Sequence, residues 1–204
     1  MIDQIQWLGH GSFAILGDPL IYINPRRVTR IPRHADAILI GNEHYEYCSL
    51  ADIEKLRGPN TQVIASGRAA QQIENCTVLR PWQSISVGRA CIKGIPAYSS
   101  RLGSSDEGGL GFVISVNYFD IYYAGQSGVL PEMGALHPDI AILPIDGNGT
   151  MTASEAAQVA AQMQPKWVIP CNWGFNASGT NRVDAQIFTR EVGRNSQVVL
   201  PTLS

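Results

Sequence analysis

Short apolar runs, separated by polar turns, recur along this chain and constrain its fold more than any other feature of the sequence. Runs this short suit β-strands, because a helix needs about ten or more residues with a 3.6-residue period. They predict strands at residues 6–8, 12–16, 20–23, 37–40 and 62–65, within 77–97, at 111–116 and 119–123 as a hairpin, and at 140–143, 167–169 and 197–200.

Helices interrupt this pattern at a few places, where capping signals mark their ends. Ser49 can accept a hydrogen bond from the first turn of a helix that follows it. Thr152 and Glu155 form a capping box for an alanine-rich helix, and a further helix is predicted at residues 183–192. A second short helix is expected to begin near Ser66.

Two stretches of the sequence resemble each other. "RHADAILIGN" and "LHPDIAILPIDG" both place a His-x-Asp sequence before a buried strand. The similarity suggests a duplicated half-domain and fits two sheets packed together with helices outside. With 204 residues, the chain is expected to form a single domain over residues 1–204.

Composition excludes some classes of function. Charged residues make up 16 % of the chain, against about 25 % in an average globular protein. The net charge of −2 and the absence of a broad basic stripe argue against a nucleic-acid partner. We also expect no membrane insertion, because no apolar run approaches the ~18 residues of a membrane span. The low content of charged residues suggests that another copy of the chain covers part of the surface, as in a homo-oligomer.

The cysteines point to a reducing compartment. Cys48, Cys76, Cys91 and Cys171 include no C-x-x-C pair, so we expect reduced thiols, most of them filling the core. The polar start of the chain lacks the apolar region of a signal peptide. Together these features predict a cytoplasmic protein.

The stretch "ILIGNEHYEYC", residues 38 to 48, carries the main functional question. An apolar strand ends there in a loop with Asn42, His44, Glu46 and Tyr47. Their spacing resembles that of residues that close on a ligand, yet only one of the four is an imidazole. The loop is therefore a metal site, the remnant of one, or an ordinary surface loop.

At this loop the chain resembles the metallo-β-lactamase superfamily, in the branch of small metal-dependent hydrolases that includes lactonase-like proteins. The resemblance rests on "WLGHGSFAI", "YINPRR", "ILIGNEHYEYCSLADIEKL", "IYYAGQSGVLPEM", "AILPIDGNGTMTASEAA" and "WVIPCNWG", which follow one another in the order of the family. It implies an α+β fold, the αββα four-layer sandwich of the metallo-β-lactamase type.

The resemblance also implies where metal ligands would stand. Enzymes of the family hold one or two divalent metals with histidine and aspartate side chains at the strand ends. In this sequence the second histidine of the loop motif is kept as His44. The other positions are exchanged: histidines become Asn42, Tyr47 and Asn172, and aspartates become Glu46 and Gln126.

These exchanges weaken a metal site. Zinc prefers imidazole, thiolate or carboxylate ligands, whereas Asn and Gln offer neutral amide oxygens. The phenol of Tyr47 has an ordinary pKa near 10 and is a poor anion. We therefore expect no metal cofactor, or at most one weakly bound zinc or manganese ion at His44 and Glu46.

The leading interpretation is a pseudoenzyme without hydrolytic activity that keeps a polar pocket for a small uncharged ligand. That pocket is expected to be lined by His10, Asn42, His44, Glu46, Tyr47, Gln126 and Asn172. The alternative is a metal-dependent hydrolase with an atypical, weak or mononuclear site. The sequence identifies no catalytic residue, and it leaves open whether the protein is an enzyme.

Overall fold

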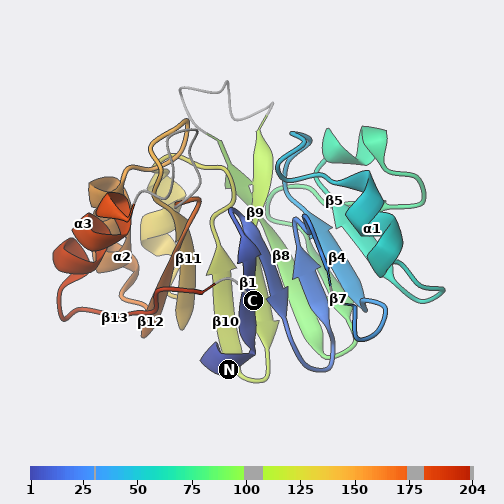
Figure 1. Cartoon of the computed structure of the whole chain (residues 1–204), viewed down its shortest axis with the longest axis horizontal. Helices are drawn as coiled ribbons and strands as arrows, with labels where there is room; N and C mark the ends of the chain where they lie inside the picture. Colours follow the sequence, from blue (N-terminus) through green and yellow to red (C-terminus); the bar gives the residue numbers. More distant parts are fainter. Residues whose placement is uncertain (30, 99–107, 174–181, 203–204) are drawn as a thin grey trace.

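The computed structural model describes residues 1–29, 31–98, 108–173 and 182–202. Two β-sheets pack face to face, and helices cover their outer faces (Figure 1). α1 lies on one side of the sheets, and α2 and α3 lie on the other. This arrangement confirms the predicted αββα sandwich of an α+β protein.

The first sheet runs in chain order. It contains β1 (Ile5–Gly9), β2 (Ser12–Ile15), β3 (Ile21–Ile23), β4 (Ala37–Ile40), β5 (Gln62–Ala65) and β6 (Thr77–Val78). Its helical segments are η1 (Ile2–Gln4), α1 (Leu50–Leu56) and η2 (Ala69–Gln72). The strands from β3 to β6 pair in parallel, so the carboxyl ends of these four strands share one edge.

The second sheet has the order β13-β12-β11-β10-β9-β8-β7. Its strands are β7 (Ser84–Val87), β8 (Ala90–Ala97), β9 (Gly109–Val116), β10 (Phe119–Tyr123), β11 (Ile140–Pro144), β12 (Trp167–Cys171) and β13 (Gln197–Val198). Its helical segments are η4 (Pro131–Ala135), α2 (Ala153–Met163) and α3 (Val183–Val192). The strands from β10 to β13 are parallel.

Three apolar cores hold these layers together. The central core lies between the sheets and includes Phe13, Leu39 and Phe112, all fully buried. One outer core joins the second sheet to α2 and α3, and the other joins the first sheet to α1. The short apolar runs thus become strands because both faces of each central strand are covered.

The capping signals in the sequence correspond to observed caps. Ser49 accepts a hydrogen bond from the backbone of Asp52 at the start of α1. Thr152 and Glu155 form the predicted capping box of α2. The helix expected near Ser66 is instead a 3₁₀ turn at Ala69–Gln72, which ends where Ile73 becomes extended and packs into the outer core of the first sheet.

The two His-x-Asp stretches perform the same local task. Asp36 accepts a hydrogen bond of 2.7 Å from the backbone N–H of Leu20, and Asp139 accepts one of 2.8 Å from that of Asp120. Each aspartate thereby links the start of a central strand, β4 or β11, to the neighbouring parallel strand. This shared role agrees with the suggestion of a duplicated half-domain, which stays a prediction. The single-domain organisation also stays a prediction.

The prediction that most cysteines fill the core holds for half of them. Cys48 and Cys171 are buried, Cys76 is partly buried and Cys91 is exposed; all four are free thiols. Cys91 points outward because Ile92, its neighbour on β8, faces the central core. Within the described residues, no helix combines the length and apolar character that a membrane span requires.

Candidate functional site

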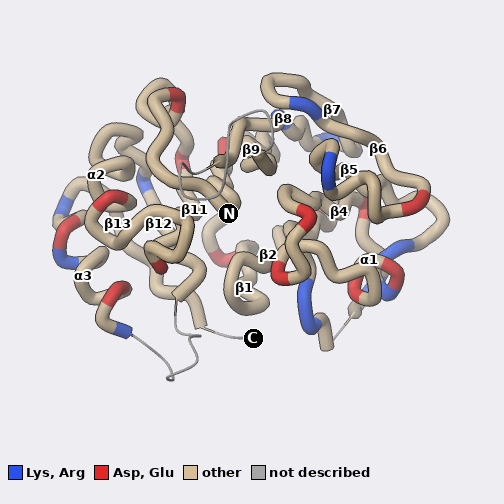
Figure 2. The backbone as a smooth tube through the Cα atoms, turned by 90° about the horizontal axis from the view of Figure 1, so that it is seen from above, with Lys and Arg blue, Asp and Glu red and all other residues tan. Residues whose placement is uncertain are grey.

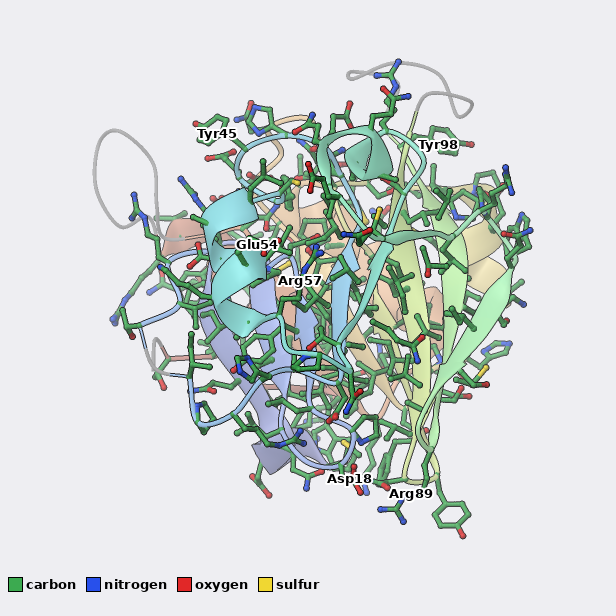
Figure 3. The ribbon with its side chains drawn as sticks, turned by 90° about the vertical axis from the view of Figure 1, so that its right-hand side faces the viewer. Asp18, Tyr45, Glu54, Arg57, Arg89 and Tyr98 are labelled. Carbon is green, nitrogen blue, oxygen red and sulfur yellow. The ribbon has the colours of Figure 1, made fainter. Side chains whose placement is uncertain are left out.

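Loops from both sheets meet at the carboxyl edge of the parallel strands. The backbone N–H of Leu110 in β9 donates to Gly41 at the end of β4 over 2.7 Å, and that of Asn172 donates to His10 over 3.2 Å. The chain segments that the sequence singled out therefore come from separate strands and converge here. Figure 3 shows Tyr45 at this end of the molecule, opposite Asp18 and Arg89.

A hydrogen-bonded pair occupies the centre of the site. The side-chain amide of Asn172 donates to the hydroxyl of Tyr47 over 2.7 Å, and both residues are buried. Burial raises the pKa of Tyr47 well above its ordinary value, so the phenol stays neutral. The Oδ1 atom of Asn172 has no hydrogen-bond partner among the described residues.

Glu46 brings the two histidines of the site together. Its Oε2 atom lies 3.5 Å from Nε2 of His10 and 3.8 Å from Nδ1 of His44. Nε2 of His10 is buried and makes no hydrogen bond within the described residues, so its contact with Glu46 is electrostatic. His10 is thus held close to a carboxylate.

The remaining two predicted residues differ in their placement. Oδ1 of Asn42 accepts a hydrogen bond of 2.8 Å from the backbone N–H of His44, which shapes the loop. Gln126 follows β10 at the same edge and is partly buried. Among the described residues, no hydrogen bond or ion pair joins Gln126 to the other six, and the binding role of all seven stays a prediction.

A second buried group of hydrogen bonds packs against the Tyr47–Asn172 pair. Asn24 donates to the hydroxyl of Tyr123 over 2.8 Å and accepts from the backbone N–H of Gly41 over 2.9 Å. The Tyr123 hydroxyl donates to the carbonyl of Gly11 over 2.7 Å. A Cβ atom on Gly11 would come within 2.7 Å of the Tyr47 ring, so glycine is required for this close packing.

Sequence reasoning missed two charged residues of the site. The guanidinium of Arg26 lies 3.9 Å from Glu46 and 5.5 Å from the ring centre of Tyr45. Asp146 follows β11, and its electrostatic influence reaches both His10 and Tyr47. Burial raises the pKa of Asp146. Arg26 and Asp146 each follow a buried strand, Arg26 in the "INPRR" turn and Asp146 after "AILPI". Their position after a strand end is the sequence signal that could have identified them as site residues.

The pH dependence of stability should report on His10. Burial lowers the pKa of His10 below its ordinary value of 6.5, against the opposing influence of Glu46 and Asp146. The unfolded chain then binds a proton at higher pH than the folded one, so the free energy of unfolding should fall as the pH drops through 6.5. His10→Asn, which suits the left-handed φ of 51°, should reduce this fall.

Denaturant unfolding at pH 8, 7, 6 and 5 measures the effect on the free energy of unfolding. The exposed His34→Asn variant is the control and should follow the wild-type curve. Identical pH profiles for His10→Asn and wild type would contradict the assignment of His10 as a buried, neutral imidazole.

The donor set does not fit the dinuclear metal centre that the resemblance implies. The Tyr47 phenol and the Asn172 amide bond each other, and burial favours the neutral phenol over the phenolate that a cation would need. Among the described residues, no three histidine, cysteine, aspartate or glutamate side chains are arranged to hold a metal ion. The arrangement supports hydrogen bonding to a polar ligand.

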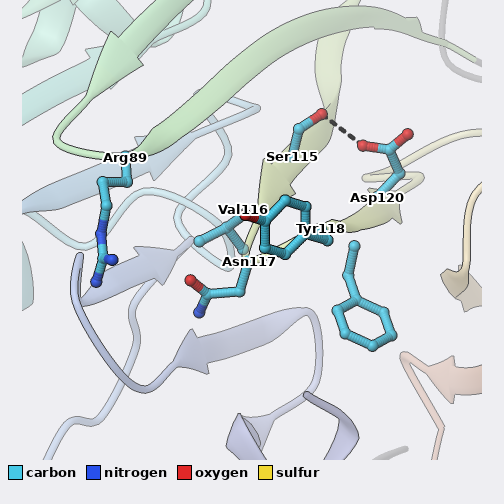
Figure 4. A pocket seen from close by; sticks show the side chains of 7 residues that line it. Arg89, Ser115, Val116, Asn117, Tyr118 and Asp120 are labelled. Carbon is cyan, nitrogen blue, oxygen red and sulfur yellow. Dashed lines mark hydrogen bonds between the residues drawn. The ribbon is translucent and has the colours of Figure 1, made fainter.

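A separate hollow (Figure 4) lies beside Arg89, at the opposite end of the molecule from Tyr45 (Figure 3). It has a volume of about 370 Å³ and surrounds the β9–β10 turn, with Arg89 beside it. Ser115 donates a hydrogen bond to Asp120, and Arg89 lies 3.8 Å from Asp18, so these charges already have partners. The hollow does not gather reactive groups as the carboxyl edge does.

Comparison with known proteins gives consistent results. Residues 4–172 match the family described as the beta-lactamase superfamily domain. A UPF0173 metal-dependent hydrolase from Methanopyrus kandleri is 30 % identical, over 97 % of this chain and 96 % of the relative. Another, from Thermococcus onnurineus, is 28 % identical over 97 % of this chain and 95 % of its own length.

Solved structures share the fold. One is a protein from Parabacteroides distasonis assigned as a metal-dependent hydrolase, with a TM-score of 0.86, 24 % identity, and coverage of 98 % of this chain and 93 % of that chain. The metallo hydrolase Igni18 from Ignicoccus hospitalis has a TM-score of 0.77 at 20 % identity, covering 96 % of this chain and 93 % of its own.

Proposed function

The chain belongs to the beta-lactamase superfamily, and from this premise we propose that it is a member without metal-dependent hydrolytic activity that binds a small uncharged ligand. One observation carries the proposal. The hydrogen bond between Asn172 and Tyr47, 2.7 Å long, joins two positions at which the resemblance implies histidine ligands. The side-chain amide of Asn172 and the hydroxyl of Tyr47 therefore find a partner in each other without a cation.

The chemistry of the ligand follows from the groups left without partners. Oδ1 of Asn172 accepts hydrogen bonds, whereas Nε2 of His10 faces the Glu46 carboxylate, which favours the tautomer that carries its proton on Nε2. A ligand hydroxyl that donates a hydrogen bond would satisfy Oδ1 of Asn172. Glu46 and Arg26 lie beside each other, so one of the two residues would repel a strongly charged ligand of either sign.

A specific observation favours a second candidate function. His10 and His44 both approach the same oxygen of Glu46, and two imidazoles with one carboxylate could serve as a set of metal ligands after side-chain movement. The relatives named as metal-dependent hydrolases give this candidate support. It would make the protein a hydrolase with one weakly held divalent metal.

Hydrolysis assays distinguish the two functions. Lactone, phosphodiester and β-lactam substrates should show no turnover above the buffer rate, with or without added zinc or manganese. The reason is that a bound metal lowers the pKa of water from 15.7 to about 7 in such enzymes, and no described side chain here replaces that effect. Metal-dependent turnover that is lost in His44→Ala would refute the proposal and establish the second candidate.

A further inference from the structure

A hollow of about 830 Å³ lies on the outer face of the first sheet. α1 leaves this part of the face open, because it lies beside β4 and β5, at a distance from β1 (Figure 1). The hollow is bounded by β1, the end of β2, β3 and the loop that leads from β3 to β4. It is distinct from the site at the carboxyl edge of the strands.

The walls of this hollow are mainly apolar. Trp7 of β1 faces the central core, so its neighbour Leu8 faces outward and lines the hollow. Leu16 and Ile31 also line it and are exposed by 36 % and 37 %. Tyr22 contributes a buried ring from β3. Such walls can take up a hydrocarbon chain.

Arg27 stands at the wall in a fixed backbone position. The buried carboxylate of Asp52 accepts hydrogen bonds from the backbone N–H groups of Arg27 and Val28, over 2.9 and 3.1 Å. Ser49 and Lys55 also bond this carboxylate, so it is held in place. The backbone of Arg27 is left-handed, with φ of 55°, which directs the chain into the loop that walls the hollow.

The guanidinium of Arg27 differs from those of its neighbours. Arg26 lies near Glu46, and Arg33 bonds Asp36 over 2.8 Å and the Gly17 carbonyl over 2.8 Å. Among the described residues, no hydrogen bond or ion pair joins the Arg27 guanidinium to a protein group. Among the described residues that line this mainly apolar hollow, Arg27 therefore contributes a positive charge that has no counter-charge.

We propose that this hollow binds a free fatty acid. The carboxylate would accept paired hydrogen bonds from the Arg27 guanidinium, a geometry that arginine favours. The hydrocarbon chain would lie along Leu8, Leu16 and Ile31. The volume falls in the range of about 300–1,000 Å³ that is common for small-molecule sites.

Calorimetric titration of the whole protein with dodecanoate, below its micelle-forming concentration, tests this proposal. Dodecanoate should bind with one molecule per chain, and dodecanol, which has the same chain without the charge, should bind about tenfold more weakly. Arg27→Gln should reduce dodecanoate binding to the level of dodecanol. Arg190→Gln, which changes an exposed arginine on α3, is the matched control and should bind as wild type does.

A second variant makes the test independent of Arg27. Ile31→Asp places a negative charge at the exposed rim and should weaken dodecanoate more than dodecanol, with an unchanged circular dichroism spectrum. The proposal is overturned if dodecanoate does not bind, if both ligands bind equally well to wild type, or if Arg27→Gln has no effect. Stronger binding to anionic lipid vesicles than to dodecanoate would also overturn it, in favour of a membrane surface.

Discussion

A variant in which the five exchanged positions carry the ligands that the family resemblance implies is expected to hold more divalent metal than the natural chain does. The changes are Asn42→His, Glu46→Asp, Tyr47→His, Gln126→Asp and Asn172→His. Imidazole and carboxylate groups replace neutral amides and a neutral phenol, so the donor set becomes one that zinc prefers. We expect the metal content to rise from well below one to as many as two ions per chain.

The control for this experiment is the same variant with His44→Ala, which removes the one ligand that the natural chain shares with the family. It should hold fewer ions than the fivefold variant. Circular dichroism and thermal unfolding establish that both variants fold. A folded fivefold variant that binds no more metal than wild type would show that the residue-by-residue correspondence with the family is wrong.

The largest effect on stability is expected from Asp52→Ala. Asp52 is 5 % exposed, and its carboxylate accepts hydrogen bonds from two backbone N–H groups and from Ser49 and Lys55. Removal leaves the buried N–H of Val28 and the partly buried N–H of Arg27 without this partner, and an unsatisfied buried group costs about 1–3 kcal/mol. The free energy of unfolding should fall by about 3 kcal/mol, which corresponds to a melting temperature lower by roughly 6–12 °C.

A nearby acidic residue provides the matched control. Glu54 lies on the same helix but is exposed and pairs with Arg57 over 3.3 Å (Figure 3). Glu54→Ala should change the free energy of unfolding by less than about 1 kcal/mol, as is usual for surface ion pairs. Equal losses in both variants would contradict the anchoring role of Asp52.

Much of the fold could be predicted because local signals agreed with tertiary packing. The run at Ala37–Ile40 became β4 with the predicted bounds, and the capping box at Thr152 begins α2. Where the prediction was wrong, tertiary packing determined the structure. The last strand, predicted at residues 197–200, covers Gln197 and Val198, and the backbone N–H of Val199 still donates to Val168 of β12. Cys91 is exposed because strand alternation takes Ile92 into the core.

The candidate site was less predictable, because its contacts join residues far apart in the sequence. The bond between Tyr47 and Asn172 spans 125 positions, and no local pattern reports it. Acidic and basic positions are scattered over the folded chain (Figure 2). Arg26 and Glu46 lie 3.9 Å apart only because the loops after β3 and β4 meet, which no local sequence pattern reports. The family resemblance placed the loops, and the side-chain partners required the structure.

The metal content of the natural chain tests the central claim most directly. Protein produced in medium supplemented with zinc and manganese, then passed through a metal-free desalting column, would be measured by elemental analysis. We predict well under one zinc, iron or manganese ion per chain, because Tyr47 and Asn172 bond each other at ligand positions. Two tightly held ions per chain would contradict this account, and one ion lost in His44→Ala would establish the mononuclear hydrolase instead.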